Sequence, residues 1–551
     1  MKIVLYLKDK IAKIIKEKYG IEGLDFDISL PPENQQADYA VNAAFTISKS
    51  LKRPPIEIST ELASLLKNDQ DFKDAVPLKG YVNIILKNEV YLENLNELMN
   101  DEGYFNNNAG KGKKINLEFV SANPVGPLNI VSGRAGAYGD AMANLLTHSG
   151  YKVHKEYYVN DHGRQSQLFA ASLLMRYLEL FGLSTEIPED GYKGDYVIEM
   201  AKKLKDEHGS QLFFIKDNKV HVKFKVFKDF GLTYILDSHK ATLERFGVKF
   251  DEWFSESSLF DAGIVDEAMK IISDKGMFYE KDGAKWFRTT DFGDDKDRVV
   301  KKNDGQYTYL VSDIAYMYNK IKRGFEIVVN ILGPDHHGYI ARLESIVQAL
   351  GYPKDMLKIV ILQQVNLLEA GEKMKMSKRE GKLVLLDELL DSVGKDAARY
   401  YFIMRNFNSH LDFDIQLAKE QSDKNPVFYV QYAYARICNI IQHAKEKGLE
   451  TEKYQLRDIN FSSLETEEKE LIIYIVGIPA AIKEAAEKYS PSFLIQYIFG
   501  LVSRFHSFYN KHRVVSDDMK ITQKRLFLML TLKKALYECF KIIGITPREN
   551  M

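Results

Sequence analysis

The order of apolar and polar positions divides the chain into three stretches of different character. Residues 1 to about 110 mix helical spacing with short strand-like runs, such as Gly80-Tyr81-Val82-Asn83-Ile84-Ile85-Leu86, and end in the polar turn NNNAGKGKK. From Ile115 strands alternate with helices, and after Asp414 the spacing is almost entirely helical as far as Met551. We therefore expect an α+β domain over residues 1–110, an α/β domain over 111–414 and an all-α bundle over 415–551.

The central stretch opens with a strand in which Ile115, Leu117 and Phe119 alternate with polar residues. The segment SANPVGP breaks that strand, and a helix rich in small residues follows, with Gly150 as its stop. Further strand, helix and strand patterns occupy residues 153–159, 326–332, 341–350 and 357–362. This succession predicts a doubly wound, Rossmann-like parallel sheet, with ligands at the carboxyl ends of its strands.

Two further regions complete the expected architecture. Residues from about 165 to 300 interrupt the strand and helix alternation with mixed patterns and charged turns, which indicates a subdomain inserted into the α/β domain. In the last stretch, amphipathic runs at residues 426–447, 465–489, 492–513 and 521–544 predict the helices of the bundle.

Composition narrows the class of protein. The chain has only two cysteines, Cys438 and Cys539, far apart, which argues against a disulfide framework or a cysteine zinc site and favours a reducing cytoplasm. No run of 18 apolar residues appears, so we expect neither export nor membrane insertion. The net charge of -1 indicates no general affinity for nucleic acid.

Charge is nevertheless concentrated locally near the carboxyl end. Between Arg504 and Lys541 there are nine Lys or Arg residues against three Asp or Glu, interleaved with Phe505, Phe508 and Tyr509. Cations beside aromatic rings suit a strand of exposed bases, and a solvated helical face over an aromatic core accounts for the segment equally well.

The most specific motif is Lys375-Met376-Ser377-Lys378-Arg379, in a loop over residues 371–381. It resembles the KMSKS loop of class I aminoacyl-tRNA synthetases, and the sequel DELLDSVGKDAARYYFIMRNFNSHLDFD resembles the arginyl-tRNA synthetase family. Further segments resemble that family in its own order, from the first domain to the last: PPENQQADYA, KGYVNIIL, LEFVSANPVGPLN, YYVNDHGRQ, TYLVSDIAY, ILGPDHHGYIARL and AKEQSDKNPVFYVQYAYARI.

The resemblance implies a ligase that activates arginine with ATP and transfers it to the 3′ end of tRNA(Arg), releasing AMP and pyrophosphate. In activation the carboxylate of arginine attacks the α-phosphorus of ATP, so the protein needs only to position the reactants and stabilise phosphate charge. ATP arrives with Mg²⁺ on its phosphate oxygens and on water, and we therefore expect no protein metal ligand.

The resemblance also assigns roles to individual residues. Those expected to act on the phosphates are Asn129, Ser132, Lys375 and Lys378, and ATP is further expected to contact Gly126, Pro127, Gly133, Met376 and Ser377. An arginine pocket needs carboxylates, other acceptors and an aromatic wall for a planar guanidinium. The residues expected there are Glu118, Asn123, Tyr309, Asp313 and, less securely placed in the family pattern, His336. A buried carboxylate at a strand end also commonly forms an ion pair that serves only to stabilise the fold.

For tRNA, the resemblance implies that the bundle meets the anticodon and that the domain over residues 1–110 meets the outer elbow. Asn83, Tyr509 and Arg513 are the expected contacts, and a single chain is the expected working unit. The pair His336-His337 also invites a zinc interpretation, which is weak because adjacent histidines point apart and no further ligands are suitably spaced.

The chain departs from the family pattern at two places. The His-x-Gly-His signature is replaced by Asn129-Ile130-Val131-Ser132, which keeps hydrogen-bonding groups at a helix start but no imidazolium, and Ala37 stands where the family has glycine. Val131 adds a branched side chain where adenine packs on bare backbone in the family. Two other functions therefore stay open: a tRNA-binding paralogue that has lost activation, and a class I synthetase for lysine.

Overall fold

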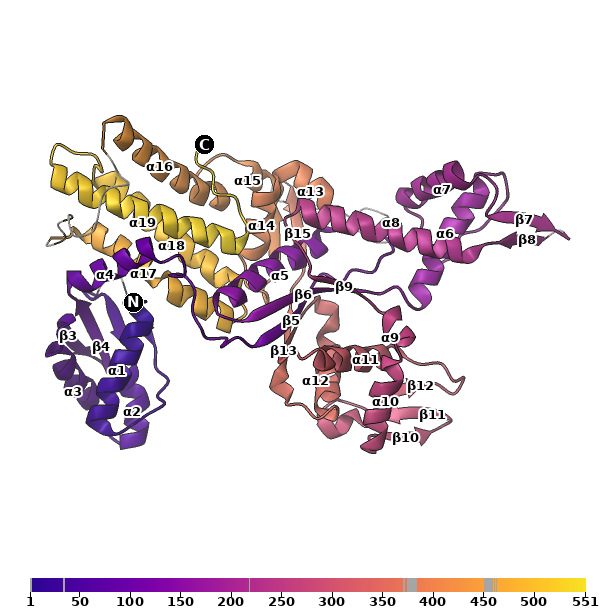
Figure 1. Cartoon of the computed structure of the whole chain (residues 1–551), viewed down its shortest axis with the longest axis horizontal. Helices are drawn as coiled ribbons and strands as arrows, with labels where there is room; N and C mark the ends of the chain where they lie inside the picture. The colour runs from indigo at the N-terminus through magenta and orange to yellow at the C-terminus, as the bar shows by residue number, and fades with distance from the viewer. Residues whose placement is uncertain are drawn as a thin grey trace.

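The structure is a computed structural model, and it describes residues 2–32, 35–217, 219–369, 372–373, 384–449, 459, 461 and 463–551. Figure 1 shows an elongated molecule, with the N-terminal domain beside the C-terminal helices at one end and a subdomain carrying a small hairpin projecting at the other. The α/β sheet lies between them.

The N-terminal domain packs helices against an antiparallel sheet in the order β1-β2-β4-β3. Its elements are α1 (Ile3–Tyr19), β1 (Ile28–Ser29), β2 (Tyr39–Val41), α2 (Ala43–Leu51), α3 (Pro55–Lys67), β3 (Phe72–Leu78), β4 (Tyr81–Leu86) and α4 (Asn88–Asn100). Helix α1 buries Ile3, Leu7, Ile11 and Ile15, whose spacing of four residues places them on one face.

The central domain is built on a five-stranded sheet in the order β14-β13-β5-β6-β9, in which all neighbours are parallel. The strands are β5 (Lys114–Glu118), β6 (Lys152–Val159), β9 (Glu252–Ser255), β13 (Ile327–Leu332) and β14 (Leu357–Ile361). The parallel sheet expected from the sequence is therefore confirmed. Helix α5 (Ile130–His148) connects β5 to β6, as the small-residue run indicated.

The region over residues 165–300 differs in one respect from the expected insertion. Its first part, α6 (Arg164–Glu179), α7 (Asp195–His208), β7 (Phe213–Lys216), β8 (Lys219–Val222) and α8 (Phe224–Arg245), has its own hydrophobic core and projects from the domain (Figure 1). Strand β9 then pairs in parallel with β6 and joins the main sheet. Four residues are too short a run for their spacing to identify them as a sheet strand.

After β9 a second layer covers the sheet. It contains α9 (Ser257–Asp261), α10 (Ile264–Asp274), β10 (Phe278–Lys281), β11 (Ala284–Phe287), η1 (Thr289–Phe292), β12 (Arg298–Lys301) and α11 (Tyr309–Lys322). The strands β10, β11 and β12 form a separate antiparallel sheet, and α10 packs on α11 (Figure 1).

The chain then completes the central domain and enters the helical one. The elements are η2 (Pro334–Tyr339), α12 (Ile340–Ala349), η3 (Lys354–Met356), β15 (Val365–Glu369), β16 (Glu372–Lys373), α13 (Leu386–Val393), α14 (Lys395–Ile403), β17 (Leu411–Asp414) and α15 (Ile415–Lys419). Strand β17 runs parallel to β15.

The C-terminal region is helical, as predicted. Its helices are α16 (Pro426–Glu446), α17 (Thr466–Glu487), α18 (Pro491–Lys511) and α19 (Met519–Ile543). Helix α16 begins where Asn425 caps the backbone N–H of Val427 and Pro426 takes the first turn. Within the described part of the chain, no helix is both long enough and apolar enough to cross a membrane.

Candidate active site

The chain leaves strand β5 through a strained backbone segment. Val120 and Ser121 both have positive φ angles, 68° and 40°, which is unusual for residues other than glycine and most unusual for a β-branched one. The Ser121 hydroxyl donates to Glu118 Oε1 at 3.2 Å and accepts from the backbone N–H of Tyr158 at 3.1 Å. Such strain persists where surrounding contacts fix the conformation, which is common at functional sites.

The loop that follows is held by the projecting subdomain. Tyr196 of α7 donates its hydroxyl to the Val125 carbonyl at 2.6 Å, and His239 of α8 places Nε2 2.7 Å from the Gly126 carbonyl. Burial lowers the pKa of His239, so its ring is neutral and donates this hydrogen bond through Nε2. The subdomain therefore fixes the backbone that leads to helix α5.

A carboxylate stands at the end of β5. Glu118 is buried, and its Oε2 lies 2.6 Å from the ammonium of Lys320, a residue of α11 that is itself fully buried. The Lys320 ammonium also lies 4.1 Å from the centre of the Tyr316 ring. Glu118 thus occupies the predicted position, and it belongs to an ion pair that the sequence did not reveal.

Two more carboxylates, Asp313 and Glu256, lie near enough to Glu118 to interact with it electrostatically. Burial raises the pKa of Asp313 to about 7, Arg342 opposes that shift, and the neighbouring Glu256 and Glu118 add to it. Burial likewise raises the pKa of Glu256, which is almost fully covered. Among the described residues, Asp313 forms no hydrogen bond or ion pair.

Tyr158 interacts electrostatically with all three carboxylates and with Asp161. Burial raises the pKa of its hydroxyl, and Glu256, Asp313 and Glu118 raise it further. The raised pKa values of Asp313 and Glu256 favour their neutral forms, and a cation bound beside them would favour the ionised forms.

The other predicted arginine contacts are exposed. Tyr309 is the first residue of α11 and is 62% exposed, and Asn123 is exposed with its amide donating to Gln165 at 2.7 Å. His336 is exposed on η2, with its ring 5.4 Å from that of Tyr339. Tyr309 follows its helix cap Thr308, and Asp313 lies four residues later, on the same face of α11.

The replaced signature lies at the amino end of α5. Asn129 is the cap of the helix: its side-chain oxygen accepts from the backbone N–H of Val131 at 2.9 Å and of Ser132 at 3.1 Å. The Ser132 hydroxyl also donates to the Asn129 side-chain oxygen, at 3.5 Å, which leaves the Asn129 amide nitrogen as the side-chain donor without a partner there among the described residues. Val131 is 46% exposed, so its side chain projects from the helix start without filling a protein core.

The other predicted ATP contacts near this helix start differ in their surroundings. Gly126 and Pro127 are half-buried in the loop before α5. Gly133 is buried, and a Cβ there would lie 2.7 Å from Leu386 and 2.9 Å from Phe402. This glycine therefore allows α13 and α14 to approach α5, and its position does not favour the predicted contact with ATP.

The segment that follows the KMSKS motif in the sequence lies beside the same helix start. Lys375, Met376, Ser377 and Lys378 lie outside the described residues. Among the described residues after the motif, Leu385 forms a β-bridge with Asn129, and the Leu386 N–H donates to the Leu128 carbonyl at 2.9 Å. The described residues just after the motif therefore lie beside Asn129.

The predicted tRNA contacts Tyr509 and Arg513 line one hollow of about 650 Å³ in the helical domain. Arg436 of α16 lines it too, with its guanidinium 4.8 Å from the centre of the Tyr509 ring. Asn83 lies elsewhere, on an interior strand, where it is 9% exposed and donates to Gln35 at 2.8 Å. Its burial does not favour the predicted contact with tRNA.

Among the described residues, His154, Glu156 and Glu252 form a cluster with the spacing of metal ligands. Arg323 occupies this cluster, because its guanidinium contacts both Glu156 and Glu252 at 2.5 Å. Within the described residues, His336 and His337 of η2 belong to no such cluster of possible metal ligands.

Comparisons with known proteins agree with this geometry. Three family models match in order: "Arginyl tRNA synthetase N terminal domain" over residues 5–86, "tRNA synthetases class I (R), catalytic domain" over 94–414 and "DALR anticodon binding domain" over 430–551. The fold is that of a class I aminoacyl-tRNA synthetase.

The similarity to individual relatives identifies the family more closely. An arginine–tRNA ligase of Oceanobacillus iheyensis is 42% identical over 99% of this chain and 96% of its own, and that of Bacillus subtilis is 40% identical over the whole of both. Thermus thermophilus arginyl-tRNA synthetase has the same fold, with a TM-score of 0.79 at 22% identity over the full length of both chains. The chain belongs to the arginyl-tRNA synthetase family.

Several residues of the site were not found from the sequence. Lys320 and Glu256 lie far along the chain from Glu118, and Arg436, Tyr196 and His239 come from helices whose spacing marks only a buried face. The only sequence feature that marks these positions is a polar residue within an otherwise apolar helix face. That feature does not show which residue the polar side chain contacts.

Proposed function

We propose that this chain is an arginine–tRNA ligase: it activates arginine with ATP and transfers the arginyl group to the 3′ end of tRNA(Arg), releasing AMP and pyrophosphate. The observation that carries this proposal is the pocket of Glu118, Glu256 and Asp313. Two of its three carboxylates have raised pKa values, and one of the three, Glu118, is already paired.

A guanidinium fits such a pocket better than other cations. It is planar, keeps its charge at all relevant pH values, and offers five N–H donors to carboxylates, whereas an ammonium is a compact point charge. Binding it restores the ionised form of Asp313. The exposed ring of Tyr309 at the rim provides a flat surface on which the guanidinium stacks.

ATP is proposed to bind at the amino end of α5, where Asn129 and Ser132 lie near Leu385, which follows the KMSKS motif in the sequence. Gly126 and Pro127 provide the adjoining backbone, and Lys375 and Lys378 neutralise phosphate charge. ATP brings Mg²⁺ on its phosphates and on water. The protein's part is to hold the α-phosphorus against the attacking carboxylate, because activation needs no covalent nucleophile.

The hollow around Arg436, Tyr509 and Arg513 is proposed to hold an unstacked anticodon base. An exposed aromatic ring and guanidinium groups in one concavity suit stacking and backbone contact. The N-terminal domain is proposed to meet the tRNA elbow through residues other than Asn83. The working unit is a single chain in a reducing cytoplasm, where Cys438 and Cys539 stay as the free buried thiols that they are here.

Two competing functions make different predictions. A paralogue that has lost activation would bind tRNA but charge nothing, and the replaced signature at Asn129 to Ser132 is the observation in its favour. A lysine-specific enzyme would charge lysine. The relatives of this chain are named arginine–tRNA ligases, which favours arginine.

The test is ATP-dependent attachment of labelled arginine to tRNA, with lysine run in parallel. We expect arginine alone to be attached, and Lys378→Ala and Asp313→Asn to abolish most of the activity. Exposed matched controls, Lys424→Ala and Asp355→Asn, should charge like the wild type. Tight binding of tRNA without charging would instead establish the paralogue.

A further inference from the structure

Two buried side chains, Tyr157 of β6 and His239 of α8, lie against the turn over residues 122–126 that leads from β5 to α5. Both residues are fully buried, and the Tyr157 hydroxyl lies 3.0 Å from His239 Nδ1. The Tyr157 ring is also stacked on that of Trp253 in β9, with the ring centres 4.2 Å apart. The pair thus joins the main sheet to the projecting subdomain.

The pair holds both ends of the 122–126 turn. The Tyr157 hydroxyl donates to the Ala122 carbonyl at 2.9 Å, at the start of the turn. At its end, His239 Nε2 lies 2.7 Å from the Gly126 carbonyl. The two ends of the turn are therefore linked through two touching side chains as well as through the backbone.

The two ends lead to different substrates under the proposed function. Asn123, which follows Ala122, is an expected contact of arginine, and Gly126 is an expected contact of ATP. Because Tyr157 bonds beside the first and His239 bonds to the second, each side chain acts on one substrate's end of the turn.

The hydrogen atoms available to this pair make the two ends unequal. A carbonyl oxygen only accepts, and a tyrosine hydroxyl has a single hydrogen. With the His239 ring neutral and its hydrogen on Nε2, the Gly126 carbonyl always has its donor. The Tyr157 hydroxyl donates either to Ala122 or to His239 Nδ1, so the Ala122 end of the turn has two hydrogen-bonded states.

The projecting subdomain supplies two neighbouring contacts to the end of the turn. Besides His239 of α8, Tyr196 of α7 donates its hydroxyl to the Val125 carbonyl at 2.6 Å. Gly126 permits this approach, because a Cβ there would lie 3.2 Å from the Tyr196 hydroxyl. Loss of a buried donor leaves a carbonyl without a partner, which costs more than loss of an exposed one.

We propose that His239 and Tyr157 are positioning residues for the activation of arginine. His239 fixes the backbone of Gly126 for ATP. Tyr157 sets the backbone of Ala122, and so the direction in which Asn123 meets arginine. The inference rests on the proposed function, because it needs both substrates to meet this turn, and it gives the projecting subdomain a part in activation.

The test compares His239→Gln with His239→Asn in the full chain. Both variants lose the buried ring, so Tm should fall in both. The amide nitrogen of glutamine takes the place of Nε2 and keeps the donor to Gly126, whereas that of asparagine takes the place of Nδ1 and does not reach it. The Kd for ATP, measured by calorimetry, should therefore be roughly two- to tenfold higher in the asparagine variant than in the glutamine variant.

Hydrogen exchange gives a second measurement that needs no substrate. Inside the turn the Val125 N–H donates to the Asn123 carbonyl at 2.8 Å. Exchange in the peptide over residues 119–131 of the free chain should be about threefold faster in His239→Asn than in His239→Gln, because only the second keeps the turn fixed at Gly126.

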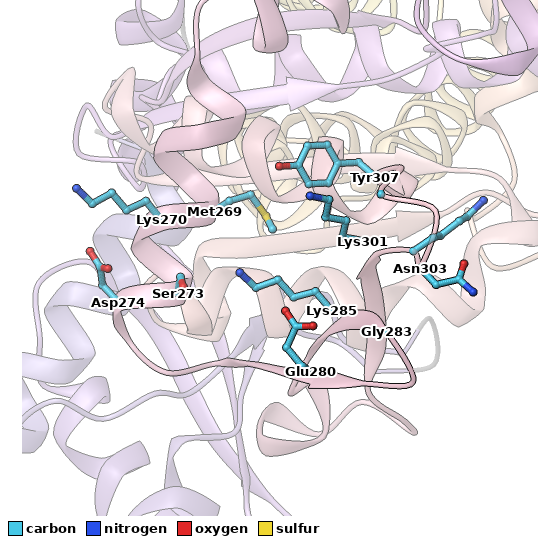
Figure 2. Close-up of a pocket in the computed structure, with 12 residues that line it drawn as sticks. Met269, Lys270, Ser273, Asp274, Glu280, Gly283, Lys285, Lys301, Asn303 and Tyr307 are labelled. Atoms are coloured by element: carbon cyan, nitrogen blue, oxygen red, sulfur yellow. The ribbon is translucent and has the colours of Figure 1, made fainter.

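Tyr157→Phe tests the other end, since it removes the hydroxyl and keeps the ring on Trp253. The Kd for arginine should rise roughly two- to fivefold, and the Kd for ATP should change less than about twofold. The control is Tyr307→Phe, which removes an exposed hydroxyl from a hollow of about 550 Å³ between α10 and the small sheet of β10, β11 and β12 (Figure 2). It should bind both substrates like the wild type.

Equal Kd values for ATP and equal exchange rates in the two His239 variants would overturn the role of His239. Wild-type binding of arginine by Tyr157→Phe would overturn that of Tyr157. Failure of the wild type to charge arginine would refute the proposed function instead, because the exchange comparison does not depend on charging. Thermal unfolding of each variant checks that its fold is intact.

Discussion

The ammonium of Lys320 lies 2.6 Å from Glu118 Oε2, at a place where both side chains are buried. This pair joins the end of strand β5 to helix α11, the two elements that carry the proposed arginine contacts Glu118 and Asp313. Glu118 is therefore held in position by the protein itself, and under the proposed function a bound guanidinium would meet a carboxylate that already has one cationic partner. Asp313 and Glu256 are left as the groups that respond most to a cationic ligand.

Lys320→Met should destabilise the protein strongly, because it leaves the Glu118 carboxylate buried without a partner. Breaking one side of a buried ion pair typically costs about 3–5 kcal/mol. We expect a lower Tm in thermal unfolding and partial recovery in the double variant Glu118→Gln/Lys320→Met, which removes the stranded charge. Lys322→Met, on the exposed side of the same helix, should change Tm little.

Arginine should bind more weakly as pH falls below about 7. The pKa of Asp313 in the empty pocket is raised to about 7, so its carboxyl becomes protonated through that range and loses its attraction for a guanidinium. The Kd for arginine, measured by calorimetry, should be about tenfold higher at pH 6 than at pH 8. Asp313→Asn should bind weakly at both values and lose this pH dependence.

The Asp313 carboxyl also makes the stability of the empty protein depend on pH, in the direction opposite to its effect on arginine binding. Because the folded-state pKa of Asp313 lies above its unfolded value, the empty protein loses stability from this group as pH rises from about 4 through 7. Saturating arginine should remove that loss. A stabilisation by arginine that is equal at pH 6 and pH 8 would contradict the assignment of the guanidinium to Asp313.

Asn129 should have two separable roles. Asn129→Ala removes the cap of α5 and should cost about 1 kcal/mol of stability, whereas Asn129→Asp keeps the capping oxygen. Both lose the amide donor proposed to face ATP. We therefore expect a raised KM for ATP in both variants and a lowered Tm in the alanine variant alone. Equal Tm values for the two would show that the cap contributes little.

Tyr309→Ala should weaken arginine binding with no effect on the fold. The side chain is mostly exposed, so its removal should change stability by less than about 0.5 kcal/mol. Loss of a ring over the guanidinium should raise the KM for arginine roughly 2- to 30-fold. Tyr352→Ala, an exposed tyrosine elsewhere on the domain, serves as the control in the charging assay.

Gly544→Ala should destabilise the protein by more than the backbone strain of its positive φ angle alone. Gly544 ends α19 at φ 74°, and a Cβ there would lie 2.0 Å from the guanidinium of Arg399, which is buried and bound to Asp140 at 2.7 Å. We expect a loss of more than about 1 kcal/mol. Gly448→Ala has φ 78° and open space around it, so it measures the backbone cost by itself. Equal Tm values for the two variants would contradict the steric explanation.

Much of the fold was predictable because its signals are local. The run from Ile115 to Phe119, the small-residue helix that follows and the long amphipathic runs after Asp414 each give a period that one element explains. Strand β9 was missed because four residues carry too little periodicity, and its place beside β6 depends on contacts distant in sequence.

The site was predictable only in part, for a related reason. Glu118 and Asp313 could be proposed from motifs, but the pairing of Glu118 with Lys320 joins residues about two hundred positions apart. Gly133 belongs to a motif segment, but in the fold it lies against Leu386 and Phe402. The sequence does not show which side of the helix faces these residues, because that depends on the packing of the whole domain. Sequence patterns indicate which residue types are present, and partners follow from the fold.

Helix α5 begins at Asn129 in the proposed phosphate site and spans about 28 Å for its 19 residues. Along its length, Tyr138 donates to the Tyr489 carbonyl at 2.6 Å and Asn144 to the Ile542 carbonyl at 3.0 Å, and α17, α18 and α19 all pack on it. Excising the helical domain would strip one side of this helix and expose its apolar surface to water. The catalytic half is therefore not a portable module, and a truncated version would need a replacement surface to remain in solution.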